Sequence, residues 1–475
     1  MIIDFICLLI IFLLFVFLLK SDLYWLYVGQ NYEYRPDRIK TYLRSRRFLF
    51  DLKDVYNPLA LTVVRRPKPT LKSLLVLFAL FCLQILGLSR FLKPLAIFFN
   101  IRQSFFLSLA LDFFVLSVLV LPFVFGLIFM INLPSILIKT LIEALAKNKI
   151  KKMKDLAVIG ISGSYGKSSS KEILAHLLSA KYRVLKTEGS INTKIGVAKT
   201  ILKNLKPNTE IFIVEMGAYK KGEIREICRI ARPKIAMITG INQQHLELFG
   251  GIDAIREAKY ELIQALPDDG AAFFNLKDTN VFPIYEKTKT RKIAYRQPSK
   301  RINSSLEADF MQVNLEGAIK VARYLKVEPK VINKQLKSLP TSRHFIRRHK
   351  GFGQSTLWDN SYNTNPSSFE ASLSMLRKNN KSKNIIITPG IIELGIAGDK
   401  VHRRLAKQIS KLASTLILSN PNFYEIFRKE LDKDVKLLVA EPKTDLTKLI
   451  DKKTVILLEG RIPGWLYKKV LARHI

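Results

Sequence analysis

One stretch decides the fold of the region around it: Gly160-Ile161-Ser162-Gly163-Ser164-Tyr165-Gly166-Lys167-Ser168. It follows the apolar run Leu156–Ile161 and leads into a helix-favouring segment, Ser168–Ala180, so it joins an expected strand to an expected helix. Closely spaced glycines let the backbone turn tightly and point its N–H groups at phosphate oxygens, and a helix N-terminus adds positive potential. The stretch therefore predicts a phosphate-binding loop in an α/β domain.

Two side chains of this loop carry its expected chemistry. Lys167 is placed to reach the β- and γ-phosphates of ATP, and Ser168 to hold Mg²⁺ through its hydroxyl. The loop departs from the usual spacing because Ile161 occupies the first glycine position, and glycines recur every three residues instead. A chance turn rich in glycine and serine is the alternative. The residues expected to contact the nucleotide are Gly163, Ser164, Tyr165, Gly166, Lys167, Ser168 and Ser169.

Beyond the loop, short apolar runs alternate with helical stretches. Buried strands that alternate with helices predict parallel sheets covered by helices on both faces. A helical pattern ends at Leu339-Pro340, so we expect a central ATP-binding domain over 151–339 and a Rossmann-like α/β domain over 340–475. Further expected strands are Ile211–Met216, Ile235–Thr239, Asn384–Thr388, Thr415–Leu418 and Thr454–Leu458.

Residues 1–150 contain long apolar runs. Phe5–Leu19, Leu74–Leu88 and Phe105–Ile131 are candidate transmembrane helices, and a signal peptide is the alternative for the first run. Asp112 is costly to bury in the third run, so it either has a function or lies near an interface. Basic residues concentrate over 35–72 and 147–154. The positive-inside rule then predicts a multi-pass protein of the cell membrane with its catalytic domains on the cytoplasmic side.

The formal net charge of the 475-residue chain is +38. Nucleic acid, anionic lipid and phosphorylated substrates are all candidate partners of such a chain. The sequence contains no recognisable module for reading nucleic acid, and its basic residues gather beside the apolar runs. We therefore expect membrane lipid and an anionic substrate as partners, and no nucleic acid. Three sparse cysteines without metal or disulfide spacing indicate a reducing compartment.

Three downstream residues are candidates for metal binding and catalysis. Glu215 ends an apolar strand, where its carboxylate is well placed to bind Mg²⁺ beside the phosphate loop. His245 follows the next expected strand, and Lys259 lies on the helix after it. Taken singly, each is more typical of an ordinary solvated position than of a functional site.

The order of these pieces resembles the Mur ligase family, whose phosphate loop reads Gly-x-x-Gly-x-x-Gly-Lys-Ser/Thr. The resemblance covers about 155–465. The motifs that carry it are Thr187-Glu188-Gly189-Ser190-Ile191-Asn192-Thr193, Val214-Glu215-Met216-Gly217-Ala218, His245-Leu246-Glu247-Leu248-Phe249-Gly250 and Lys259-Tyr260-Glu261. Asp359-Asn360-Ser361-Tyr362-Asn363-Thr364-Asn365-Pro366 looks like the branch that adds D-alanyl-D-alanine to a muramoyl tripeptide.

The resemblance implies an ATP-dependent, ADP-forming peptide ligase of cell-wall precursor synthesis that works through an acyl phosphate. It implies ATP and Mg²⁺ as cofactors, an anionic cell-wall precursor as acceptor, and an amino acid or dipeptide as amine donor. The residue roles that it implies are catalysis by Lys167, His245 and a carbamylated Lys259; magnesium binding by Ser168, Glu215 and His245; acceptor contacts by Asn192 and Thr193; and ATP contacts by Arg343, Asp359 and Asn363.

Some positions depart from that family's pattern. Gly240 stands where many relatives have Asn, Asn360 where a second Asp is usual, and Glu459-Gly460-Arg461 where Lys-Gly-Ser is frequent. Apolar runs also replace the domain that holds the UDP part of the substrate. Two alternatives therefore stay open: a membrane-bound ATP-binding regulator or scaffold, and a related amide ligase with a lipid-linked or polyglutamate-type acceptor.

Overall fold

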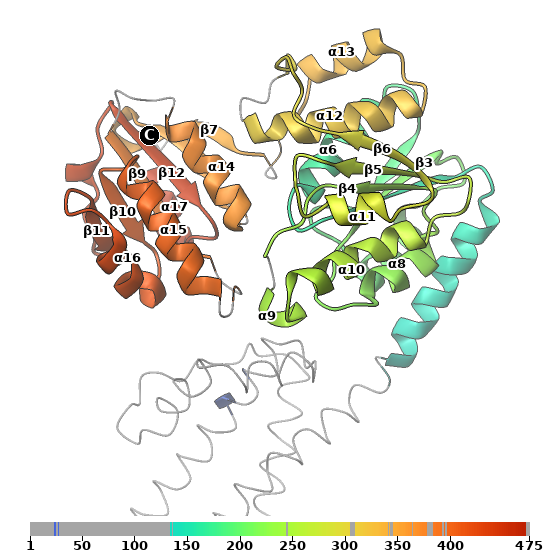
Figure 1. Ribbon diagram of the computed structural model, residues 1–475, viewed down its shortest axis with the longest axis horizontal. Coiled ribbons are helices and arrows are strands. Elements are labelled where there is room, and N and C mark those ends of the chain that lie inside the picture. The colour runs from blue at the N-terminus through green and yellow to red at the C-terminus, as the bar shows by residue number, and fades with distance from the viewer. Residues whose placement is uncertain are drawn as a thin grey trace, which may run out of the picture. The chain divides into compact units, whose positions relative to one another are not determined.

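The computed structural model describes residues 23–24, 27, 134 and 136–471, except 244–245, 305–308, 341, 343–344, 363, 378–382, 392–393 and 395–396. The chain divides into two compact units, Met1–Thr140 and Leu141–Ile475. A helix spans residues 136–152. The second unit contains two α/β sheets (Figure 1).

The first sheet has six parallel strands in the order β2-β3-β1-β4-β5-β6. Their bounds are β1 (Ala157–Ser162), β2 (Val184–Lys186), β3 (Ile211–Met216), β4 (Ile235–Ile238), β5 (Ala271–Asn275) and β6 (Arg291–Tyr295). Within β1, Ile159 and Ile161 join the hydrophobic core on one face of the sheet, and Val158 joins the core on the other. Burial on both faces explains why these strands read as continuous apolar runs.

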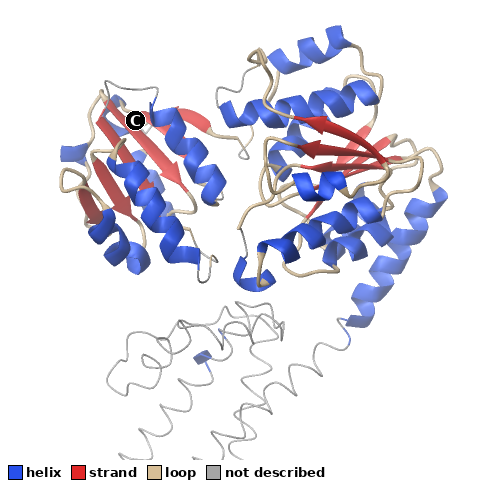
Figure 2. Ribbon diagram, in the orientation of Figure 1, coloured by secondary structure: helices blue, strands red, loops and turns tan. Residues whose placement is uncertain are grey.

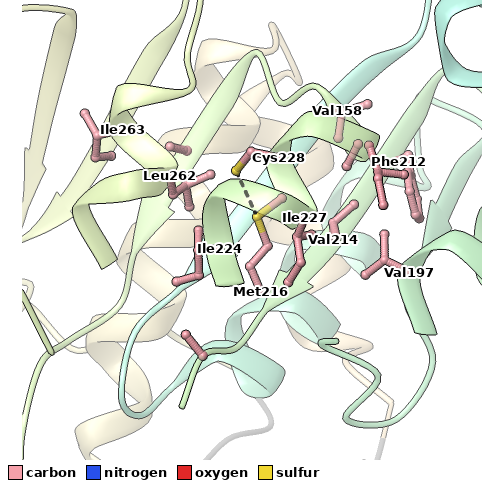
Figure 3. Close-up of a cluster of buried hydrophobic side chains, with 14 of the residues drawn as sticks. Val158, Val197, Phe212, Val214, Met216, Ile224, Ile227, Cys228, Leu262 and Ile263 are labelled. Atoms are coloured by element: carbon pink, nitrogen blue, oxygen red, sulfur yellow. Dashed lines mark hydrogen bonds between the residues drawn. The ribbon is translucent and has the colours of Figure 1, made fainter. Parts of the chain in front are cut away.

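Helices cover both faces of this sheet (Figure 2). One face packs against α6 (Lys167–Leu178), α12 (Asp309–Tyr324) and α13 (Pro329–Lys337). The other packs against α7 (Lys194–Asn204), α8 (Glu223–Ala231), α10 (Ile252–Gln264) and the shorter α9 (Leu246–Phe249) and α11 (Phe282–Glu286). Figure 3 shows part of the second core, where Cys228 Sγ of α8 lies 3.6 Å from Met216 Sδ of β3. Cys228 is thus a buried packing residue.

The second sheet has the order β11-β10-β9-β12-β8-β7, and only its edge strand β7 runs antiparallel to its neighbour. Its strands are β7 (Arg347–Lys350), β8 (Thr356–Asn360), β9 (Lys383–Thr388), β10 (Thr415–Leu418), β11 (Lys436–Val439) and β12 (Thr454–Glu459). Its helices are α14 (Pro366–Arg377), α15 (Gly398–Ser410), α16 (Tyr424–Glu430) and α17 (Gly464–Val470). Separate hydrophobic cores lie on its two faces.

The prediction of an α/β fold with parallel sheets is confirmed. Each expected strand matches an observed one to within one residue at either end, and the helix expected over Ser168–Ala180 is α6. The pattern missed β2, β5, β6, β8 and β11. β2 has three half-buried residues, and β6 and β11 begin with exposed charged side chains, so these three lack a continuous apolar run. β5 and β8 are short and largely buried, and the expected strands did not include them. The antiparallel edge β7 was also not foreseen.

The three candidate transmembrane runs and Asp112 lie outside the described residues. Among the helices that the structure does describe, none combines the length and the apolar character needed to cross a membrane.

Candidate nucleotide and ligase site

The phosphate loop connects β1 to α6 at the carboxyl edge of the first sheet. Gly166 precedes α6 with φ of 76°, a left-handed conformation that residues with a side chain rarely adopt. A Cβ atom at Gly163 would lie 2.9 Å from Gly240 O and overlap the Thr239 hydroxyl. The loop therefore requires glycine at both positions for reasons of backbone shape.

Tyr165 attaches this loop to the segment that follows β4. Its hydroxyl donates to Asp278 Oδ2 at 2.7 Å, and the same oxygen accepts from Ile241 N at 2.7 Å. Burial and the charge of Asp278 raise the pKa of Tyr165, so the hydroxyl stays protonated and keeps donating. The Tyr165 ring occupies the space that a Cβ atom of Gly240 would need. Gly240, the first departure from the family pattern, is thus the residue that accommodates the ring.

The side chain of Lys167 lies back on its own loop. Its Nζ donates to Gly163 O at 2.7 Å and to Ser164 O at 3.3 Å. Burial lowers the pKa of Lys167, and the charge of Glu215 partly opposes that change. A phosphate is a stronger acceptor for an ammonium than two neutral carbonyl groups, so a bound phosphate can draw Lys167 away from them.

Glu215 is the second-last residue of β3, lies beside the phosphate loop and is 1% exposed. Its Oε2 accepts from Ser168 Oγ at 2.9 Å and from Lys171 Nζ at 3.0 Å, while Oε1 lies 3.3 Å from Asn192 Nδ2. Mg²⁺ is usually held by one or two carboxylates together with substrate phosphates and waters. The hydroxyl of Ser168 and the carboxylate of Glu215 are hard oxygen donors that fit this ion. Within the described residues, no group of three or more His, Cys, Asp or Glu side chains is placed so that it could hold a metal ion.

A pocket brings the phosphate loop together with the loops that follow β2 and β3. Its lining residues are Gly163, Ser164, Lys167, Asn192, Gly217, Ala218, Tyr219, Phe249, Ile255 and Lys259. Lys259 of α10 is 4% exposed. Burial, with the nearby charge of Lys167, lowers the pKa of Lys259 to about 7. Part of this lysine is therefore uncharged, and so nucleophilic, at neutral pH.

Other predicted site residues lie further from this arrangement or outside it. His245, Arg343 and Asn363 lie outside the described residues. Thr193 is exposed just before α7. Ser169 lies half-buried in the first turn of α6.

Asp359, predicted to contact ATP, is 2% exposed at the end of β8 and is already bonded within the second sheet. Its Oδ2 lies 2.5 Å from Arg347 Nη2 and accepts from the Tyr467 hydroxyl at 2.9 Å. Burial alone would raise the pKa of Asp359, but hydrogen bonds from Ser361 and Tyr467 and the charge of Arg347 lower it. Its carboxylate is thus held by protein groups rather than left open to a nucleotide.

Sequence reasoning missed Lys171 and Asp278. Lys171 follows Lys167 by four residues, so both lie on one face of α6, and that spacing was the available signal. Asp278 follows β5 in a turn, and no local pattern connects it with Tyr165, which lies 113 residues earlier.

The sequence of this chain is similar to proteins of known function. Residues 161–337 match the Mur ligase middle domain. The chain is 27% identical over 293 residues to the UDP-N-acetylmuramoyl-tripeptide–D-alanyl-D-alanine ligase of Bacillus subtilis, which covers 57% of this chain and 64% of the relative. The Synechocystis enzyme of the same name is 28% identical, with 56% and 63% covered. The chain thus spans just under two thirds of the length of these curated relatives.

A solved structure, MurF from Acinetobacter baumannii, superposes with a TM-score of 0.64 at 22% identity, covering 70% of this chain and 80% of that one. At this identity the likeness supports the fold. It agrees with the parallel α/β architecture described above.

The predicted multi-pass location in the cell membrane is wrong on these comparisons. The matching relatives are ligases named for a UDP-linked substrate, and the described residues hold no helix able to cross a bilayer. Two of the three apolar runs have 15 residues, fewer than the roughly 20 that a spanning helix needs, so their apolarity was weak support. The membrane-lipid partner depended on that location and is dropped with it. What the comparisons establish for this chain is that residues 161–337 match the Mur ligase middle domain.

Proposed function

We propose that this chain is an ATP-dependent, ADP-forming ligase that makes an amide bond in cell-wall precursor synthesis. The acceptor is a muramoyl tripeptide and the amine donor is D-alanyl-D-alanine, as the names of the curated relatives suggest. One observation carries the proposal. The phosphate loop, Asn192 and Lys259 line a single pocket, and Glu215 lies within hydrogen-bonding reach of Ser168 and Asn192.

In this proposal ATP binds with its phosphates on the loop, where backbone N–H groups and the N-terminus of α6 favour negative charge. Lys167 leaves the carbonyls of Gly163 and Ser164 and binds the β- and γ-phosphates. Ser168 and Glu215 hold Mg²⁺, which when bound reduces the charge repulsion between the phosphates and the attacking carboxylate.

The reaction then has two steps. A carboxylate oxygen of the acceptor attacks the γ-phosphorus, the bond to the β-phosphate oxygen breaks, and ADP leaves. The donor amine next attacks the carbonyl carbon of the acyl phosphate, inorganic phosphate leaves, and the amine nitrogen loses a proton. Asn192 and Thr193 contact the acceptor. The position of Asn192 supports its contact, because Asn192 lines the pocket and its amide lies within reach of Glu215.

We further propose that Lys259 carries a carbamate. Its burial and its pKa of about 7 supply the uncharged amine that reacts with carbon dioxide. The amine nitrogen attacks the carbon of carbon dioxide and loses a proton to solvent. The resulting carbamate carries a negative charge near Lys167, so the repulsion between two ammonium groups is removed. The roles of His245, Arg343 and Asn363 stay predictions, and an ATP contact by Asp359 would require ATP to displace Arg347 or Tyr467.

We also propose the domain bounds 151–339 and 340–475, which the two separate sheets and their cores support. Residues 1–150 form a third region without a counterpart in the family pattern.

The test is an assay of the purified full-length chain with ATP, Mg²⁺, UDP-linked muramoyl tripeptide and D-alanyl-D-alanine. We expect equal amounts of ADP and of the ligated product, measured by mass spectrometry. Lys167→Ala should lower kcat by about 10³-fold, since it removes a donor aimed at the transferring phosphoryl group. ATP binding without ADP release in the presence of both substrates would favour the regulator instead.

A further inference from the structure

Lys171 is a fully buried ammonium one helical turn beyond Lys167. Its side chain is 0% exposed. Nζ lies 3.0 Å from Glu215 Oε2 and donates to Gly189 O at 2.5 Å. A buried charge must be paired and hydrogen-bonded, so these two partners fix the position of the ammonium.

Both partners belong to elements that form the site. Oε2 of Glu215 is shared between Lys171 and Ser168, and this leaves Oε1 directed toward Asn192. Gly189 lies three residues before Asn192, in the turn closed by the hydrogen bond from Ile191 N to Glu188 O. Lys171 therefore joins the helix of the phosphate loop, the strand-end carboxylate and the loop that presents Asn192.

Stability alone does not account for a lysine here. A buried ion pair commonly stabilises a fold no better than apolar side chains of similar volume. The neighbouring positions Ile173 and Leu174 of α6 are filled by apolar core residues. What sets Lys171 apart is the identity of the two groups that it connects.

We propose that Lys171 is a positioning residue that couples cation binding at Glu215 to the placement of the loop 188–193. The proposal rests on the proposed function, in which Glu215 holds Mg²⁺ and Asn192 faces the acceptor. A divalent cation at Glu215 repels the ammonium and competes for the carboxylate. Lys171 then bonds more strongly to Gly189 O, and the acceptor loop becomes more ordered. Coupling of this kind is reciprocal, so an ordered loop also favours the cation.

The experiment measures hydrogen exchange of the segment 188–193 in the full chain with ATP, before and after Mg²⁺ is added. In the wild type Mg²⁺ should slow exchange of these amides. In Lys171→Met the slowing should disappear. In the same Lys171→Met variant, the Mg²⁺ concentration that gives half-maximal ATP binding, measured by calorimetry, should be about fivefold lower than in the wild type, because a competing positive charge has been removed. Lys171→Arg keeps the charge and should restore the slowing.

Lys186→Met is the matched control. Lys186 of β2 pairs with Glu172 of α6, the residue after Lys171, and this pair is partly exposed and involves neither Glu215 nor Gly189. It should behave as the wild type does. If Lys171→Met does not fold, Lys171→Gln keeps a neutral donor and should also lose the response to Mg²⁺.

Retention of the slowing in the neutral variants, or a higher Mg²⁺ requirement in them, would overturn the coupling. Failure of the proposed function would look different. In that case the wild type would form no amide product, and the exchange measurements would still decide whether Lys171 couples Mg²⁺ to the loop.

Discussion

Two buried carboxylates lie within the last two residues of strands at the carboxyl edges of the two sheets, and their surroundings differ. Glu215 of β3 is 1% exposed and has the Lys171 ammonium 3.0 Å away. Glu459 of β12 is 0% exposed, and its carboxylate accepts from two neutral groups, Asn360 Nδ2 at 2.8 Å and Thr364 Oγ1 at 2.6 Å. Burial raises the pKa of Glu459 to about 7, although these hydrogen bonds partly offset the effect.

The comparison teaches that an acidic residue at the end of a strand does not by itself mark a metal site. Glu215 has a cationic partner and lies beside the phosphate loop, whereas Glu459 holds the segment after β8 through its neutral partners. Asn360 and Glu459 face each other across the β8–β12 pairing. The departures from the family pattern at Asn360 and at Glu459 therefore belong to one feature, because the amide of Asn360 donates a hydrogen bond to the carboxyl group of Glu459.

The largest expected effect comes from breaking the first pair. Glu215→Gln leaves Lys171 buried without a counter-charge, so the free energy of unfolding should fall by about 3–5 kcal/mol. Urea unfolding followed by circular dichroism measures it. Glu172→Gln, which breaks the partly exposed pair with Lys186, is the control and should cost about 1 kcal/mol or less. Equal losses in the two variants would contradict the distinction between the pairs.

Replacing the second carboxylate, Glu459, should have the opposite effect above neutral pH, where the substitution should stabilise the fold. The pKa of Glu459 is higher in the folded chain than in the unfolded chain, so the folded state binds more protons between pH 4.5 and about 7. The carboxyl's contribution to stability is therefore present at pH 4.5 and is lost as pH rises to about 7. Glu459→Gln should remove this dependence, with a relative gain of about 3 kcal/mol at pH 8 over pH 4.5. Unfolding curves at both pH values test it, and parallel changes in the two proteins would refute it.

A smaller effect is expected where the phosphate loop is held by packing rather than by charge. Gly240→Ala places a methyl group in the space of the Tyr165 ring, so the free energy of unfolding should fall by about 1–3 kcal/mol and ATP should bind more weakly. Thermal unfolding and calorimetric titration with ATP measure the two changes. Combining Gly240→Ala with Tyr165→Ala should recover part of the loss if the ring is the cause. An additive loss in the double variant would rule the ring out.

Local patterns predicted the parts of the fold that depend on local physics. Glycine spacing predicted the loop after β1. Apolar runs predicted strands such as β3 and β10, because a strand buried on both faces has apolar side chains at consecutive positions. The partners of Lys171 could not be predicted, since Gly189 and Glu215 lie 18 and 44 residues away and meet it only through the sheet order. The sequence alone offers no reason for glycine at position 240, whereas the structure shows that the Tyr165 ring occupies the space of a Cβ atom there.

Asp359 shows how the surrounding fold bears on a motif. Its motif predicts an ATP contact, and in the structure its carboxylate is bonded to Arg347 and Tyr467. A motif fixes which residue ends a strand, whereas the neighbouring strand and helix decide what that residue can reach.

Oxygen transfer tests the proposed ligase chemistry most directly. The acceptor is prepared with ¹⁸O in its reacting carboxylate and incubated with the full-length chain, ATP, Mg²⁺ and the dipeptide donor. An acyl phosphate route moves one carboxylate oxygen into inorganic phosphate for each amide bond formed, so mass spectrometry should find one ¹⁸O per phosphate released. Phosphate without ¹⁸O, in which water supplied the one oxygen that does not come from ATP, would contradict the ligase mechanism and identify the chain as an ATP hydrolase.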